Sequence, residues 1–173
     1  MRLIAAAVLA ALALPSAAGA QEYPRRLPAS GGEVIIAGPG GQYAHDTVGY
    51  APARRAGNTL YVSGAIVFRA EGEGTDLAAF EAQVRRALTS LNRTVTAAGA
   101  TMDDVALINS FHVWEGPDFT GTRTEQIEVI SRVWREFSQG PRPAWTAVGT
   151  TGLLGAGGIV EIQLTVHSPA PEG

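Results

Sequence analysis

The feature that most constrains the fold is a pattern of alternating apolar and polar residues near the C-terminus. The apolar members are Val160, Ile162, Leu164 and Val166, and the polar members between them are Glu161, Gln163 and Thr165. This period of two is typical of a strand with one buried face. A shorter strand is predicted from Ala144 to Val148, and the glycine-rich segment 149–158 joins the two. The strands are therefore expected to form a hairpin or to be neighbours, with Glu161 and Trp145 close together and lining any site.

The first twenty residues have the composition of a secretory signal peptide. Arg2 precedes an apolar run from Leu3 to Leu14, and small residues end the segment at Ala18-Gly19-Ala20. Cleavage is predicted between Ala20 and Gln21. A membrane anchor is disfavoured because spanning a bilayer takes roughly 20 apolar residues. The mature chain is expected to be periplasmic or secreted, with no membrane association after cleavage.

Composition excludes several kinds of chemistry. The chain has 173 residues, which suits one domain, and contains no cysteine, so disulfides and thiol catalysis are ruled out. All 13 basic residues are arginines, which excludes a lysine Schiff base. The net charge is -3 and no basic run occurs, so nucleic acid is not an expected partner.

Residues 21–48 are rich in proline, glycine and serine, and we predict a flexible, exposed lead-in with an edge strand at Val34 to Ala37. The compact domain is predicted over residues 49–168, followed by a loose tail at 169–173. A strand is expected from Thr59 to Gly64, where Gly64 ends it before Ala65 to Phe68. A later strand is expected from Ala106 to Trp114.

Two helices are predicted. The first runs from Leu77 to about Ala98, with Asp76 as its N-cap and Gly99 after its end. The second runs from Arg123 to Phe137, with a buried stripe predicted at Ile127, Ile130, Trp134 and Phe137. The order is β-β-α-β-α-β-β, so two helices cover one face of a sheet. The other face needs a cover, which predicts an oligomer.

Other polar residues are weaker candidates for a site. His45 and Asp46 lie in the lead-in without a third metal ligand nearby, and Asp103 and Asp104 suit a turn at a helix end. No metal site is predicted. His112 is a possible general base, but no serine or acid is placed beside it by spacing in the sequence.

Six ordered pieces of the chain resemble one family. They are Tyr50-Ala51-Pro52-Ala53, Leu60-Tyr61-Val62-Ser63-Gly64, the segment from Ala97 to Val105, Asp118-Phe119, Pro143-Ala144 and Val160-Glu161-Ile162. In this order and spacing they resemble the RidA/YjgF family, over about Gly49 to Val166. The resemblance implies a chorismate-mutase-like α+β fold, with a mixed sheet carrying two helices on one face. It also implies a homotrimer with a sheet-lined core, small-molecule clefts between subunits, and hydrolysis of reactive imines and enamines without cofactors.

The resemblance also implies roles by position. Tyr50 and Gly64 match residues that line the cleft, and Glu161 matches the glutamate that handles water. Trp145 stands where deaminating members carry an arginine that holds the substrate carboxylate. Arg142 is a weaker candidate to take the place of that arginine, and Ala147 makes the same wall more apolar. An indole favours a neutral, aromatic or cationic ligand.

Two hypotheses follow from the resemblance. One is a trimer that binds small apolar or aromatic molecules and has lost the deamination of simple 2-imino acids. The other is an exported hydrolase or deaminase of an imine or enamine that uses Glu161 and water. A nuclease, a label sometimes attached to the family, is disfavoured by the acidic charge.

Overall fold

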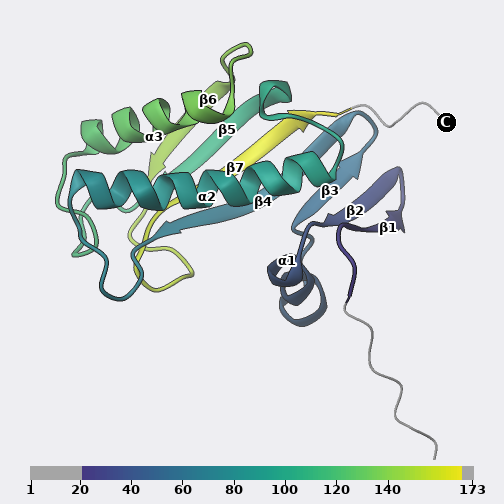
Figure 1. Cartoon of the computed structure of the whole chain (residues 1–173), viewed down its shortest axis with the longest axis horizontal. Coiled ribbons are helices and arrows are strands. Elements are labelled where there is room, and N and C mark those ends of the chain that lie inside the picture. The colour runs from purple at the N-terminus through teal and green to yellow at the C-terminus, as the bar shows by residue number, and fades with distance from the viewer. Residues whose placement is uncertain (1–20, 169–173) are drawn as a thin grey trace, which may run out of the picture.

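A computed structural model describes residues 21–168 of the chain. The predicted signal peptide at 1–20 and the tail at 169–173 lie outside the described residues. A seven-stranded mixed sheet carries two long helices on one face (Figure 1). The predicted α+β class is therefore confirmed, as is the predicted order of elements from β3 to β7.

The strands take the spatial order β1-β2-β3-β4-β7-β5-β6. All neighbours are antiparallel except β5 and β6, which are parallel. The strands are β1 (Arg25–Ala29), β2 (Gly32–Ile36), β3 (Ala53–Ala56), β4 (Thr59–Phe68), β5 (Val105–His112), β6 (Ala144–Gly149) and β7 (Gly158–His167). The short helical pieces are α1 (Pro39–Tyr43), the π-helical turn η1 (Ala44–Val48) and the 3-10 turn η2 (Met102–Asp104).

Helix α2 (Leu77–Ala97) begins and ends where the sequence predicts. Asp76 accepts a hydrogen bond from the Ala79 amide at 2.9 Å, which satisfies one free donor of the first turn. Gly99 has a φ of +81°, the left-handed conformation that glycine adopts most readily after a helix. The predicted apolar face is buried: Phe80, Val84, Ala87, Leu88, Leu91 and Val95.

Helix α3 (Arg123–Phe137) matches its predicted bounds, and Thr122 and Glu125 form a capping box. Its buried face differs from the predicted stripe, since it contains Gln126, Val129 and Val133 as well as Ile130 and Trp134. Ile127 and Phe137 are only partly buried. The stripe turns toward Gln126 because that amide has a hydrogen-bonding partner on β5.

The predicted hairpin of β6 and β7 is wrong. Strand β5 lies between them and pairs with both. The reason is the connection: β5 and β6 are joined through helix α3, and such a crossover makes the two strands parallel neighbours. Strand β7 then returns antiparallel on the other side of β5.

The predicted lead-in is also wrong for residues 25–48. Strands β1 and β2 extend the sheet beyond β3, and Ile35 and Ile36 are fully buried. The proline- and glycine-rich composition reflects the turns of this segment, such as Gly31 at a φ of +70°. Residues 25–48 are therefore part of the fold.

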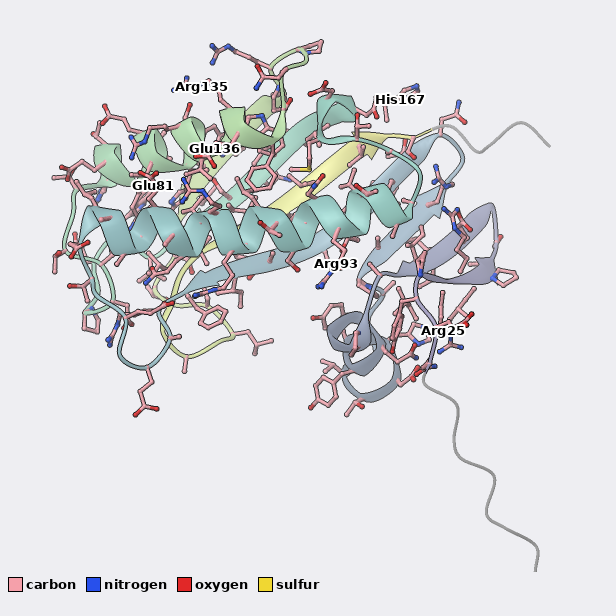
Figure 2. All side chains as sticks on the ribbon, in the orientation of Figure 1. Arg25, Glu81, Arg93, Arg135, Glu136 and His167 are labelled. Carbon is pink, nitrogen blue, oxygen red and sulfur yellow. The ribbon has the colours of Figure 1, made fainter. Side chains whose placement is uncertain are left out.

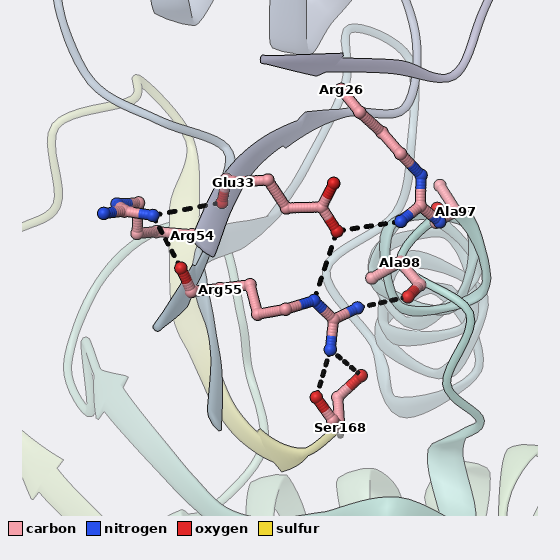
Figure 3. Close-up of polar contacts among 7 residues, drawn as sticks. All are labelled: Arg26, Glu33, Arg54, Arg55, Ala97, Ala98 and Ser168. Atoms are coloured by element: carbon pink, nitrogen blue, oxygen red, sulfur yellow. Dashed lines mark hydrogen bonds and ion pairs between the residues drawn. The ribbon is translucent and has the colours of Figure 1, made fainter. Parts of the chain in front are cut away.

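An arginine cluster ties this N-terminal hairpin to the end of α2 (Figure 3). Buried Arg55 contacts Glu33 of β2 at 3.2 Å and donates to the carbonyls of Ala98 and Ser168. Arg26 donates to Glu33 at 2.8 Å and to the Ala97 carbonyl at 2.7 Å. Cations at the C-terminal end of a helix satisfy free carbonyls and oppose its dipole.

The two faces of the sheet differ in burial. The face under α2 and α3 contains Val62, Ile108, Ile162 and Leu164, each at most 2% exposed. The other face exposes large apolar side chains, among them Tyr61, Phe111 and Val148. Within residues 21–168, no helix combines the length and apolar character needed to cross a membrane.

Candidate functional site

A cleft of about 370 Å³ lies beside strand β4. Strand β3 pairs with β4 only over Thr59 to Val62, so the rest of β4 extends past its neighbour. The space there is bounded by residues 62–68 of β4, by α2 from Arg86 to Thr94, and by the N-terminal segment between Ala37 and Pro52. A cleft of this volume suits a small molecule.

Two of the predicted site residues line this cleft. Tyr50 follows the end of η1 and is half exposed, and Gly64 lies in β4. Gly64 sits at an irregularity in the β4–β7 pairing, between Val62 and Ala65. Tyr50 and Gly64 therefore line the same cleft.

Glu161 lies directly against Gly64. A Cβ atom on Gly64 would come within 2.0 Å of the Glu161 Oε1 atom, so only glycine leaves room for this carboxylate. Glu161 pairs with Ile66 on one side and Phe111 on the other, and its neighbours Val160 and Ile162 are buried. Its side chain therefore lies on the sheet face that α2 and α3 leave open. Within residues 21–168 it has no hydrogen bond or ion pair.

The structure does not bring Trp145 to Glu161. Trp145 pairs with Ile108, which is buried under the helices, so the indole lies on the opposite face of the sheet. Its Nε1 donates to Ser110 Oγ at 2.8 Å, and the ring packs against the core. The prediction that these two side chains are adjacent fails because β5 separates their strands and their side chains point to opposite faces.

Trp145 is one end of a buried hydrogen-bond chain. Ser110 Oγ lies 2.7 Å from His112 Nε2, and His112 Nδ1 lies 2.9 Å from Gln126 Oε1. The Gln126 amide nitrogen donates to the Val113 carbonyl, so Gln126 Oε1 accepts from His112 Nδ1. His112 Nε2 then accepts from the Ser110 hydroxyl, whose oxygen accepts from Trp145. Every member is satisfied with neutral His112.

This hydrogen-bond chain contains a serine–histidine pair of the kind used in nucleophilic catalysis, but its burial excludes a catalytic role. Ser110 and His112 are both fully buried, so no substrate reaches the hydroxyl. Burial lowers the pKa of His112, and the hydrogen bond to Gln126 opposes that effect. The predicted possibility of His112 as a general base therefore has no supporting geometry.

Ala147 and Arg142 also lie away from the cleft. Ala147 pairs with Ser110 and so shares the face of Trp145, at the edge of the sheet. Arg142 precedes β6 and lies beside α3, in a hollow with Trp134 and Arg135. Neither residue lines the cleft that contains Tyr50 and Gly64 within one protomer.

Residues on the polar side of α2 are not among the predicted site residues. Arg86, Ser90, Arg93 and Thr94 all line the cleft. Their spacing is i, i+4, i+7 and i+8, which places them along one stripe of a helix. That spacing can be seen in the sequence, but it indicates a cleft only when the N-terminal segment is known to face this side of α2. Across residues 21–168, no group of three potential metal ligands occurs.

Comparison with known proteins is consistent with this fold. The family described as Endoribonuclease L-PSP matches residues 42–168. The RutC family protein YjgH of Escherichia coli is 38% identical over 123 residues, covering 71% of this chain and 84% of that protein. A 2-iminobutanoate/2-iminopropanoate deaminase of Dermatophagoides farinae is 32% identical over 104 residues, covering 60% of this chain and 74% of that protein.

Solved structures agree. The structure of YjgH superposes with a TM-score of 0.55 at 36% identity, covering 73% of this chain and 88% of that chain. RidA from an Antarctic Psychrobacter superposes with a TM-score of 0.53 at 27% identity, covering 68% and 87%. Together with the profile match, these likenesses show that the chain belongs to the Endoribonuclease L-PSP family, which is the RidA/YjgF family.

Proposed function

We propose that this protein is an exported homotrimer that binds small apolar or aromatic molecules in its clefts and has lost the deamination of simple 2-imino acids. The observation that carries the proposal is the Glu161 carboxylate over Gly64. Within residues 21–168 it has no cationic partner, and its pairing neighbours are Ile66 and Phe111. A substrate carboxylate placed beside it would be repelled, because like charges at close range disfavour each other.

The proposed loss of deamination rests on Trp145. The resemblance places the substrate-binding arginine at this position, and here the side chain is an indole bonded to Ser110. A bidentate arginine contact to a carboxylate contributes about 1.5–3 kcal/mol. Without it, affinity for a simple 2-imino acid should fall about ten- to a hundredfold.

The trimer is proposed from the open face of the sheet. Tyr61, Phe111 and Val148 expose apolar surface on the face opposite the helices. Light scattering coupled to gel filtration should give three times the mass of the mature chain, and Phe111→Asp should give the monomer mass. A wild-type monomer at all concentrations would contradict the trimer.

Binding is tested by thermal shift with a panel of neutral, cationic and acidic aromatic molecules. At least one should raise the unfolding temperature, because a ligand of the folded state stabilises it. Tyr50→Ala removes a cleft side chain and should weaken the shift. Tyr43→Ala is the matched control, since Tyr43 is exposed on α1 and does not line the cleft. The absence of any shift across the panel would reject the proposal.

A second candidate is hydrolysis of an imine or enamine by Glu161 and water. Its support is the carboxylate at Gly64 and the similarity to the Dermatophagoides farinae deaminase. An assay that generates 2-iminobutanoate and follows its conversion to the keto acid separates the two. Turnover by wild type that Glu161→Gln abolishes would favour this candidate over loss of activity.

A further inference from the structure

A hollow of about 220 Å³ lies where α3 ends and the chain turns toward β6. It is lined by Ser131, Trp134 and Arg135 of α3 and by the segment from Ser138 to Arg142. In Figure 2, Arg135 lies on the side of α3 that faces away from α2. The hollow shares no lining residue with the cleft beside β4, so the two are separate features of the protomer.

Two arginines of the hollow have no partner. Arg135 and Arg142 are exposed, and within residues 21–168 neither guanidinium forms a hydrogen bond or an ion pair. By contrast, Arg132 of the same helix pairs with Glu81 at 2.6 Å. No aspartate or glutamate is among the described residues that line the hollow. Its wall therefore has two positive charges and no negative one.

Asp103 is the carboxylate that contacts this segment, and its hydrogen bonds go to other groups. Its Oδ1 atom accepts from the Ser138 hydroxyl at 2.9 Å and from the amides of Gln139 and Gly140 at 2.8 and 2.9 Å. A Cβ atom on Gly140 would lie 2.7 Å from the Asp103 Cβ, so the turn packs tightly against this side chain. Asp103 therefore fixes the wall of the hollow, while in the described part of the chain it bonds to neither arginine.

The end of α3 does not require either guanidinium. Cations in the last turn of a helix commonly bind its free carbonyls or oppose its dipole. Here the Ser138 amide donates to the Trp134 carbonyl at 3.1 Å, and the Gln139 side-chain amide donates to the Arg135 carbonyl. Both guanidinium groups therefore remain available for a ligand.

We propose that this hollow binds a phosphate group, free or carried by a small phosphate monoester, between Arg135 and Arg142. A phosphate monoester has a charge of about -1.5 to -2 at neutral pH and three acceptor oxygens. Two guanidinium groups match that charge, and each can bind two of the oxygens side by side. Ser131 lies one turn before Arg135 on α3, so its hydroxyl can donate to the same group.

The rest of the hollow suits a rigid site beside an apolar surface. Pro141 and Pro143 flank Arg142 and restrict the backbone that presents it. Trp134 and Pro141 supply apolar lining on which the organic part of a monoester can lie. The site lies outside the cleft, so this proposal does not depend on what the cleft binds.

The test uses phenyl phosphate as the probe, with isothermal titration calorimetry on the mature chain at low ionic strength, where exposed charges are least screened. Arg135→Gln and Arg142→Gln should each weaken binding about ten- to a hundredfold. Arg93→Gln is the matched control. Arg93 is also exposed and without an acidic partner within residues 21–168, but it lines the cleft instead of the hollow. This control should bind phenyl phosphate as the wild type does.

Two further probes separate the sources and the outcomes. Phenyl sulfate has the same ring and a similar tetrahedral group with a single charge, so it should bind about tenfold more weakly or worse. Inorganic phosphate binding less tightly than phenyl phosphate would identify a monoester site, and the reverse order would identify a site for free phosphate. The proposal is overturned if neither phosphate compound binds, if phenyl sulfate binds equally well, or if either hollow variant keeps wild-type affinity. Loss of binding in Arg93→Gln would place the phosphate in the cleft and overturn it too.

Discussion

The structure predicts that Ser110 and Trp145 stabilise the fold through a shared hydrogen bond. Ser110→Ala leaves the fully buried His112 Nε2 without a donor. An unsatisfied buried group costs about 1–3 kcal/mol. Trp145→Phe removes only one donor, at a partly buried position, and Ser110 keeps its bond to His112. Its cost should be about 0.5–1.5 kcal/mol.

The measurement is urea unfolding followed by far-UV circular dichroism at one protein concentration, because oligomer stability depends on concentration. The double variant should cost less than the sum of the two singles, since both remove the same bond. Thr146→Ala is the control: Thr146 is the next residue of β6 and is exposed. If Trp145→Phe behaves like this control and Ser110→Ala costs nothing, the buried chain is refuted and Trp145 is free to serve a ligand site.

Three further outcomes are expected. Burial lowers the pKa of His112 in the folded state below its ordinary value of 6.5, so the neutral imidazole favours folding. The stability that this pKa difference supplies is present above pH 6.5 and is lost as pH falls, and His112→Gln should therefore flatten the acid limb of a stability–pH profile. Arg55→Ala should cost about 3–5 kcal/mol in urea unfolding because its partners are left buried, whereas Arg26→Ala, at a more exposed site, should cost about 0–1 kcal/mol. Gly64→Ala should destabilise by about 1–3 kcal/mol through contact with Glu161, and adding Glu161→Ala should recover part of that loss; simple additivity would contradict the contact.

The periodic elements could be predicted from the sequence, because their apolar spacing is set by local geometry. Both long helices and strands β5 and β7 begin and end within two residues of their predicted limits. Strand β4 begins at the predicted Thr59 but continues to Phe68, four residues past the predicted end at Gly64. Caps such as Asp76 are local signals that the structure reproduces. The order of strands in the sheet is not local, and the glycine-rich link before β7 allowed a hairpin that the α3 crossover excludes.

Burial of polar side chains was the harder part to predict. Gln126 occupies a core position on α3 because His112 accepts and donates within the same buried chain, and amphipathic spacing treats glutamine as exposed. The N-terminal hairpin was missed for a related reason. Its stability comes from contacts with residues distant in the sequence, such as the hydrogen bond from Arg55 to the end of α2. A proline-rich composition does not indicate such contacts.

Of the predicted site residues, Tyr50 and Gly64 line one cleft, and Glu161 lies against Gly64 on the open face of the sheet. Trp145 and Ala147 lie on the opposite face, because the face of a residue depends on strand register. Register between β5 and β6 is set by the α3 crossover, which the sequence pattern does not determine.

Restoring the family's arginine at position 145 tests whether residue 145 and Glu161 lie on opposite faces of the sheet, as the strand register implies. Trp145→Arg would place a guanidinium on the helix-covered face beside Ser110, where the indole now donates to the hydroxyl. It would lie across the sheet from Glu161, so it should not create a carboxylate site next to that glutamate. We expect lower stability, from a charge brought near a buried hydrogen-bond chain, and no gain in conversion of 2-iminopropanoate. Arg93, which lines the cleft and has no acidic partner within residues 21–168, also lies on a different side of Gly64 from Glu161. In a 2-imino acid the imine carbon is bonded to the carboxylate carbon, so these two side chains are not placed to act on one such molecule together. A gain of deamination by Trp145→Arg would show that position 145 reaches Glu161 in the assembled protein. The inference that the two faces of the sheet keep these residues from acting on one substrate would then be wrong.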